Sequence, residues 1–155
     1  MAKQKSASSP FVRFLFVVYC GVMLWLLFGR STGWVDGQSY VQMLQRNMNL
    51  KPLYTIRNYV YVVRQNTNPE LVRHCIINLG GNIFLFIPAG YLLPRIFQKQ
   101  RNFFRFLLTC TLSILVVETA QLFSLLGSFD IDDLILNLAG MVIGFSIYHI
   151  RHPKN

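Results

Sequence analysis

Charged side chains are scarce in this sequence. Only 14% of its 155 residues are Asp, Glu, Lys or Arg, whereas soluble domains carry about 25%. Apolar residues make up 53% of the chain and the mean hydropathy is +0.39. This composition argues against an ordinary cytosolic globule, and it excludes a disordered chain, which needs low hydrophobicity.

Acidic residues are scarcer still, and cysteines are few. Six Asp and Glu face 15 Lys and Arg, so the formal net charge is +9. Such a charge suits nucleic acid or a membrane surface, but the long apolar runs favour the membrane, and no nucleic-acid partner is expected. The three cysteines are odd in number and lack any Cys-x-x-Cys or Cys/His spacing, so neither a disulfide framework nor a zinc site is indicated.

Four segments are long and apolar enough to cross a bilayer, which takes about 20 mainly apolar residues. They lie at about 11–28, 76–93, 103–126 and 131–150. The first ten residues resemble a short disordered leader, and residues 11–152 form one predicted membrane domain. The expected fold class is therefore all-α: a polytopic membrane protein with four transmembrane helices.

The boundaries of these segments carry recognisable signals. Asn68 precedes the second as an N-cap, Asn102 opens the third and an acidic run opens the fourth, while Pro94 is expected to end the second. The first segment could instead be a cleaved signal peptide, because basic residues precede it. The absence of an Ala-x-Ala site after it favours a retained transmembrane helix.

The distribution of basic residues predicts the orientation. Arg95, Lys99, Arg101 and Arg105 crowd the connection 94–105, whereas the connection 127–133 has three acids and no base. Basic connections stay in the cytoplasm, so both termini are expected to be cytoplasmic. The long connection 29–75 carries six bases, but its length dilutes their weight.

That long connection contains a second ordered element. Ile56, Tyr59, Val60 and Val63 follow helical spacing, with basic residues on the opposite face. A basic amphipathic helix lying in the headgroup plane is one interpretation. A short strand over Tyr59–Val63 is the other, because these residues are β-branched or aromatic.

Polar residues inside the predicted spans are the candidate functional groups, because burying them in lipid is costly. Within each span the polar residues lie on one face of the predicted helix. In the fourth span, polar residues and glycines are spaced 3, 4, 3 and 4 residues apart and so form a continuous stripe. The polar members are Asn78, Asn82, Glu118, Gln121, Asp130, Asp133 and Asn137, and the stripe continues through Gly140 and Gly144.

The depths of these residues agree between helices. At 1.5 Å per residue, Glu118 lies roughly 13 Å below the outer boundary, and Asn82 and Asn137 lie roughly 9 Å deep. If their faces converge, they line one polar pocket beneath the turn 127–133.

Structural roles compete with this interpretation. The aspartates could cap the fourth helix, the asparagines could hydrogen-bond between helices, and the glycines could serve close packing. Glu118 is the hardest of these residues to explain structurally.

Three segments carry a resemblance to a known family. The first runs from Asn78 to Gly90 (NLGGNIFLFIPAG). The second joins Glu118–Gln121 (ETAQ) to the run GSFDIDDLILNLAG at 127–140. A weaker third match, NLKPLYTI, begins at Asn49. Over about residues 45–147 the sequence resembles the VanZ-like family.

The resemblance implies a small multi-pass protein of the bacterial cytoplasmic membrane. The family takes its name from a member linked to resistance to teicoplanin, a lipoglycopeptide that binds cell-wall precursors. The matched polar positions include all seven residues named above together with Asp132. The resemblance names no settled chemistry for them.

Three functions remain open from the sequence. A binding protein would engage a membrane lipid, a lipid-linked cell-wall precursor or the acyl tail of a teicoplanin-like lipoglycopeptide. A membrane enzyme would act on a lipid or lipid-linked sugar through Glu118, Asp130, Asp132 or Asp133. A lipid or ion carrier would couple through Glu118, but no inverted repeat supports it. No cofactor is expected, except that Asp130, Asp132 and Asp133 could bind a divalent cation.

Overall fold

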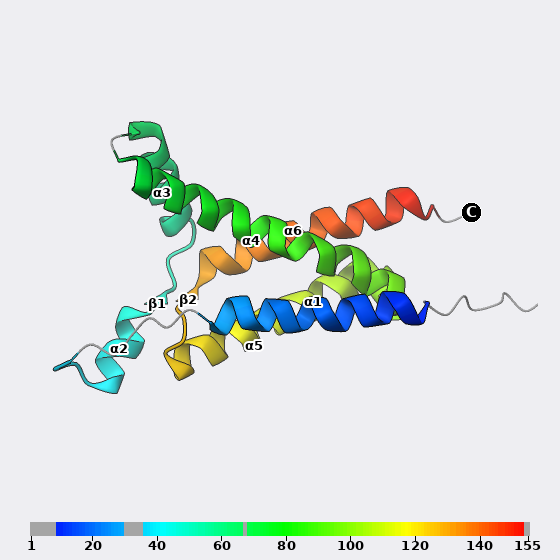
Figure 1. Ribbon diagram of the computed structural model, residues 1–155, viewed down its shortest axis with the longest axis horizontal. Coiled ribbons are helices and arrows are strands. Elements are labelled where there is room, and N and C mark those ends of the chain that lie inside the picture. Colours follow the sequence, from blue (N-terminus) through cyan, green and yellow to red (C-terminus); the bar gives the residue numbers. More distant parts are fainter. Residues whose placement is uncertain (1–8, 30–35, 67, 154–155) are drawn as a thin grey trace, which may run out of the picture.

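The computed structural model describes residues 9–29, 36–66 and 68–153, so most of the predicted leader lies outside the described residues (Figure 1). Four helices are long and apolar enough to cross a membrane, as predicted: α1 (Pro10–Phe28), α4 (Pro69–Ile96), α5 (Phe103–Ser124) and α6 (Ile131–Arg151). Large apolar side chains on all four are exposed, for example Val17, Phe84, Val116 and Ile150. Lipid is the solvent that such a surface requires, so the all-α, multi-pass fold class is confirmed.

The short elements gather at one end of the bundle. Helices α2 (Tyr40–Arg46) and α3 (Tyr54–Gln65) lie there with the strands β1 (Met48–Asn49) and β2 (Phe129–Asp130). The beginning of α1 and the end of α6 lie at the opposite end (Figure 1). The short 3-10 helix η1 (Gln98–Arg101) links α4 to α5. We call the first of these ends the α3 end.

The predicted helix caps are present, but two boundaries differ from prediction. Asn68, Asn102 and Asp130 each accept a backbone N–H in the first turn of α4, α5 and α6. Pro94 does not end α4, which continues to Ile96. A proline removes only its own N–H as a hydrogen-bond donor. The N–H groups after Pro94 can still bond to carbonyls one turn back, and Phe97 N–H donates to the Leu93 carbonyl at 2.9 Å. Helix α5 ends at Ser124 because Leu125 adopts a positive φ of 55°.

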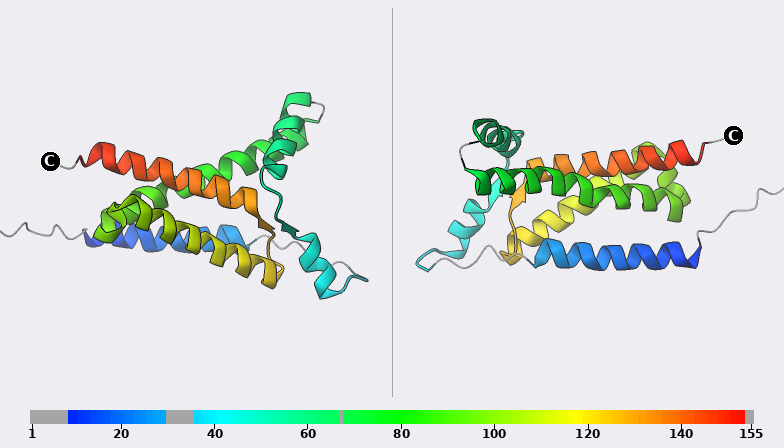
Figure 2. Two further views of the ribbon diagram at one scale, coloured as in Figure 1. Left: turned by 180° about the vertical axis from the view of Figure 1, so that it is seen from behind. Right: turned by 45° about the horizontal axis from the view of Figure 1, so that its top comes forward.

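Helices α4 and α6 lie side by side along much of their length, and glycines make this possible (Figure 2). A Cβ on Gly90 would collide with the Met141 carbonyl, and one on Gly140 would collide with that of Ile83. Gly144 is equally close to the Ile87 carbonyl. The structure therefore gives Gly140 and Gly144 the close-packing role.

Helix α1 lies on the side of the bundle away from α6 (Figure 2). The Tyr19 hydroxyl donates to the Leu85 carbonyl at 2.7 Å, and Met23 enters the core with Phe86 of α4 and Phe106 of α5. Most other side chains of α1 are exposed or only partly buried. Helix α1 therefore covers the other helices without being enclosed by them.

The amphipathic segment in the long connection is the helix α3, so the alternative strand over Tyr59–Val63 is wrong. Helix α2 was not predicted. A capping box stabilises the N-terminus of α2: the Ser39 hydroxyl accepts from Gln42 N–H, and the Gln42 side chain accepts from Ser39 N–H. The Tyr40 hydroxyl then donates to the Phe123 carbonyl at 2.7 Å, which ties α2 to the end of α5.

Candidate functional site

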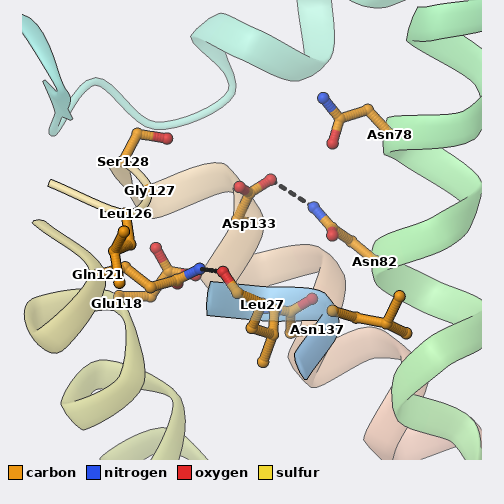
Figure 3. A pocket seen from close by; sticks show the side chains of 11 residues that line it. Leu27, Asn78, Asn82, Glu118, Gln121, Leu126, Gly127, Ser128, Asp133 and Asn137 are labelled. Atoms are coloured by element: carbon orange, nitrogen blue, oxygen red, sulfur yellow. Dashed lines mark hydrogen bonds between the residues drawn. The ribbon is translucent and has the colours of Figure 1, made fainter. Parts of the chain in front are cut away.

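A polar cavity of about 210 Å³ lies near the α3 end of the bundle (Figure 3). Six of the seven residues predicted to bind a ligand line it: Asn78, Asn82, Glu118, Gln121, Asp133 and Asn137. The remaining lining residues are Leu26, Leu27, Leu126, Gly127 and Ser128. The structure thus brings together polar groups from α4, α5 and α6, and α1 covers them with the two leucines.

Hydrogen bonds across the cavity hold its walls together. Asn82 Nδ2 donates to the carboxylate of Asp133, which joins α4 to α6 (Figure 3). Gln121 Nε2 donates to the Leu27 carbonyl at 2.6 Å, which joins α5 to the end of α1. The Glu118 side chain is 4% exposed, and one of its oxygens accepts from Asp130 N–H at 3.4 Å. Glu118 is therefore buried within the bundle, in agreement with its predicted position well inside the third span.

Hydrogen-bond pairing within the cavity is incomplete. Asn137 is 2% exposed, and its Oδ1 atom is buried with no hydrogen-bond partner among the described residues. Such an oxygen is costly to leave unpaired. The amide nitrogens of Asn78, Asn82 and Gln121 all donate to other protein groups. Among the described residues that line the cavity, none is Lys, Arg or His.

Asp130 does not line the cavity with the other predicted residues. Its carboxylate accepts from Thr55 Oγ1 at 2.6 Å, from Asn49 Nδ2 at 3.3 Å and from Asp132 N–H at 2.9 Å. As the N-cap of α6 it has extended backbone angles, so it leaves the helical stripe that continues through Asp133 and Asn137. Asp130 joins the long connection to the start of α6.

Asp132, on α6, binds the first turn of α3. Its side chain is fully buried, and its two oxygens accept from the backbone N–H groups of Leu53 and Ile56. The first N–H groups of a helix have no partner within the helix, and Leu53, at the N-cap, has no side-chain acceptor. The buried carboxylate of Asp132 on α6 therefore acts as the N-cap acceptor of α3.

The predicted divalent cation remains a prediction. Among the described residues, no group of three or more His, Cys, Asp and Glu side chains could hold a metal ion. The oxygens of Asp130 and Asp132 already accept protein hydrogen bonds, and only Asp133 of the three candidates faces the cavity. The three aspartates do not form one coordination shell.

Several contributors to the site lay outside the predicted set. Asn49 and Thr55 bind Asp130, and Asn49 belongs to the weakest of the three family segments. The Tyr59 hydroxyl accepts from Asn78 Nδ2 at 3.1 Å, and burial raises its pKa. The hydroxyl of Tyr59 therefore keeps its proton beside Asn78. In the sequence, the one indication of this role was the helical spacing that places Tyr59 on the apolar face of α3.

The fold and the cavity together define a small polytopic membrane protein whose candidate site lies between its spans. The chain belongs to the VanZ/LLP1 family, whose model matches residues 16–152. No curated protein and no solved structure matches the chain significantly. The family assignment agrees with the resemblance of the three segments, whose polar residues gather near the α3 end.

Proposed function

We propose that this protein lowers the sensitivity of a bacterial cell to teicoplanin-type lipoglycopeptides. Its cavity would engage a lipid-linked cell-envelope molecule or the acyl tail of the antibiotic. The observation that supports a functional site is the gathering of polar side chains from three apolar helices into one cavity, including a buried oxygen that has no partner in the described part of the chain. The choice of antibiotic follows from the family resemblance.

The location that fits this function is the cytoplasmic membrane, with both termini in the cytoplasm. The end of α4 and the start of α5 lie at the same end of the bundle as the beginning of α1 and the end of α6 (Figure 1). Together with η1 these parts of α4 and α5 carry Arg95, Lys99, Arg101 and Arg105, and basic connections favour the cytoplasmic side. The cavity would then lie in the outer half of the bilayer, near lipid-linked precursors.

Cysteine labelling tests this orientation. In a variant without the native cysteines, we expect a cysteine at Ser128 to react with a membrane-impermeant maleimide in intact cells. A cysteine at Gln98 should react only after the cells are opened. Ready labelling at Gln98 with none at Ser128 would reverse the topology.

Two isosteric substitutions test the role of the carboxylates. Glu118→Gln and Asp133→Asn keep the side-chain shape and remove the charge. We expect both to reduce teicoplanin protection to the level of cells without the protein, with unchanged amounts of protein in the membrane. The measurement is the minimal inhibitory concentration of teicoplanin, with vancomycin, which lacks the acyl tail, as the comparison drug.

Glu70→Gln is the matched control, because Glu70 is an exposed acid on α4 that pairs only with Arg73 among the described residues. It should keep full protection. Full protection by both cavity variants would show that protection does not depend on the carboxylates. A lack of protection by the unmodified protein in a susceptible Gram-positive host would contradict the proposed function itself.

A second candidate function is a membrane enzyme acting on a lipid or a lipid-linked sugar. The observation that favours it is that Glu118 and Asp133, from two different helices, face the same cavity. Two carboxylates around one substrate are a common arrangement for general acid–base catalysis. Mass spectrometry of membrane lipids from cells with and without the protein tests this function. A new lipid product that disappears in Glu118→Gln would support it, and identical lipid profiles would oppose it.

A further inference from the structure

An apolar groove adjoins the polar cavity. A small cavity of about 80 Å³ shares Leu27, Glu118 and Asn137 with the polar cavity. The same small cavity shares Phe86 and Met141 with a groove of about 290 Å³ between α1, α4 and α5. The three spaces therefore lie next to one another, separated by the side chains they share, and the series begins among polar groups and ends among apolar ones.

The groove has the composition and length for a hydrocarbon chain. Its walls include Phe16 and Met23 of α1, Leu93 of α4 and Val117 of α5. From Leu27, beside the polar cavity, to Phe16 is eleven helical residues, or roughly 16 Å. That is about half of the 30 Å hydrocarbon thickness of a bilayer, the depth of one leaflet. The groove thus fits one lipid chain running from the cavity toward the bilayer centre.

The polar cavity restricts the head group. Among the described residues no donor reaches Asn137 Oδ1, and the amide nitrogens of Asn78, Asn82 and Gln121 each give one of their two N–H groups to the protein. A ligand hydroxyl that donates to Asn137 Oδ1 would satisfy this buried oxygen, and its own oxygen could accept from a remaining amide N–H. Two carboxyl groups, those of Glu118 and Asp133, line the cavity, and no basic residue lines it within the described chain to pair with a phosphate. An uncharged group with several hydroxyls matches these acceptors.

We propose that the polar cavity and the groove between α1 and α5 form one binding site for a lipid with an uncharged sugar head group. The sugar hydroxyls donate to Asn137 Oδ1 and to the two carboxylates, and one hydrocarbon chain lies in the groove. This inference rests on the proposed function in one respect: it specifies the chemistry of the molecule that the same cavity engages.

Binding of alkyl ligands with matched chains tests the inference. The full chain is placed in phosphatidylcholine nanodiscs, and equilibrium binding of dodecyl glucoside, dodecyl phosphate and glucose is measured against empty nanodiscs. We expect dodecyl glucoside to bind at least about tenfold more tightly than dodecyl phosphate, a difference of about 1.4 kcal/mol. Glucose alone should bind far more weakly, because it lacks the chain.

Variants separate the two halves of the site. Ser113→Phe fills the groove from α5, and Cys20→Trp fills it from α1; each should weaken both alkyl ligands about tenfold. Val116→Phe is the matched control, because Val116 is exposed on another face of α5. Asn137→Leu should weaken dodecyl glucoside about fivefold, the loss of one hydrogen bond, with dodecyl phosphate unchanged.

Three outcomes would overturn the inference. One is equal or tighter binding of dodecyl phosphate, with or without Mg²⁺. Another is dodecyl glucoside binding that neither groove variant affects. The third is an unchanged head-group preference in Asn137→Leu. A protein that protects cells but fails these tests would contradict only this inference, whereas one that passes them without protecting cells would contradict only the proposed function.

Discussion

Replacing Gly140 with alanine is expected to separate α4 from α6 and to prevent a stable fold. The added Cβ would collide with the backbone carbonyl of Ile83, and backbone cannot move aside as a flexible side chain can. Overpacking in a core costs about 1–3 kcal/mol, and this rigid contact should cost at least about 3 kcal/mol. The measurement is the fraction of folded protein across an SDS titration, followed by circular dichroism.

The same substitution should also disturb the cavity. Gly140 lies one turn beyond Asn137 on α6, and Ile83 follows Asn82 on α4. Opening the helices at this point would lengthen the bond from Asn82 to Asp133. Gly81→Ala on α4 is the matched control, because no heavy atom lies within 4 Å of the added carbon. Equal resistance to SDS in Gly140→Ala and Gly81→Ala would show that the glycine contact does not hold the helices together.

Asp132→Ala is expected to unfold the start of α3 and to release it from α6. The substitution leaves the N–H groups of Leu53 and Ile56 without acceptors. A hydrogen bond to a charged group contributes about 1.5–3 kcal/mol, so losing both should cost about 3–6 kcal/mol. Hydrogen exchange should show faster amide exchange over residues 53–57, and trypsin should cut at Arg57.

A milder substitution at Asp132 distinguishes capping from packing. Asp132→Asn keeps one acceptor oxygen and nearly the same volume, so its loss of protection should fall between those of wild type and Asp132→Ala. Glu70→Ala removes an exposed acid whose ion pair contributes about 0–1 kcal/mol, and it should leave α3 protected. Protection of residues 53–57 that is unchanged in Asp132→Ala would refute the capping role.

The sequence predicted the four spans and most of the cavity because both depend on local regularities. Hydropathy marks each span, and a rise of 1.5 Å per residue gives the depth of Glu118, Asn82 and Asn137. Helical spacing places Asp133 and Asn137 on one face. Three residues at the same depth on neighbouring helices then meet, as the structure shows.

The same regularity failed where the helix begins. Spacing alone puts Asp130 in line with Asp133 and Asn137, but Asp130 has φ −124° and ψ 122° and so stands outside the helix. Its partners, Asn49 and Thr55, lie in a different part of the chain. The acceptor role of Asp132 could not be predicted either, because its donors are backbone groups, which no side-chain pattern specifies.

The shortest elements were missed for a related reason. Helix α2 has seven residues, and its Ser39 and Gln42 capping pair is a weak signal without a long apolar face after it. The pairing of β1 with β2 spans only two residues on each strand. Neither element has enough length for periodicity to reveal it.

The cap that Asp132 provides also sets an order of assembly. Chains are made from the N-terminus, so all of α3 emerges before the carboxylate that completes its first turn, which lies 79 residues after Leu53. Until α6 enters the membrane, the bonds from Leu53 and Ile56 cannot form, and neither can those from Asn49 and Thr55 to Asp130. A chain that stops before Asp130 contains every residue of α3 and its contacts with α4, but not the carboxylates that fix its first turn. The last helix to be synthesised is therefore the one that closes the α3 end, so arrival of α6 is the step that makes a nascent chain into a finished binding site.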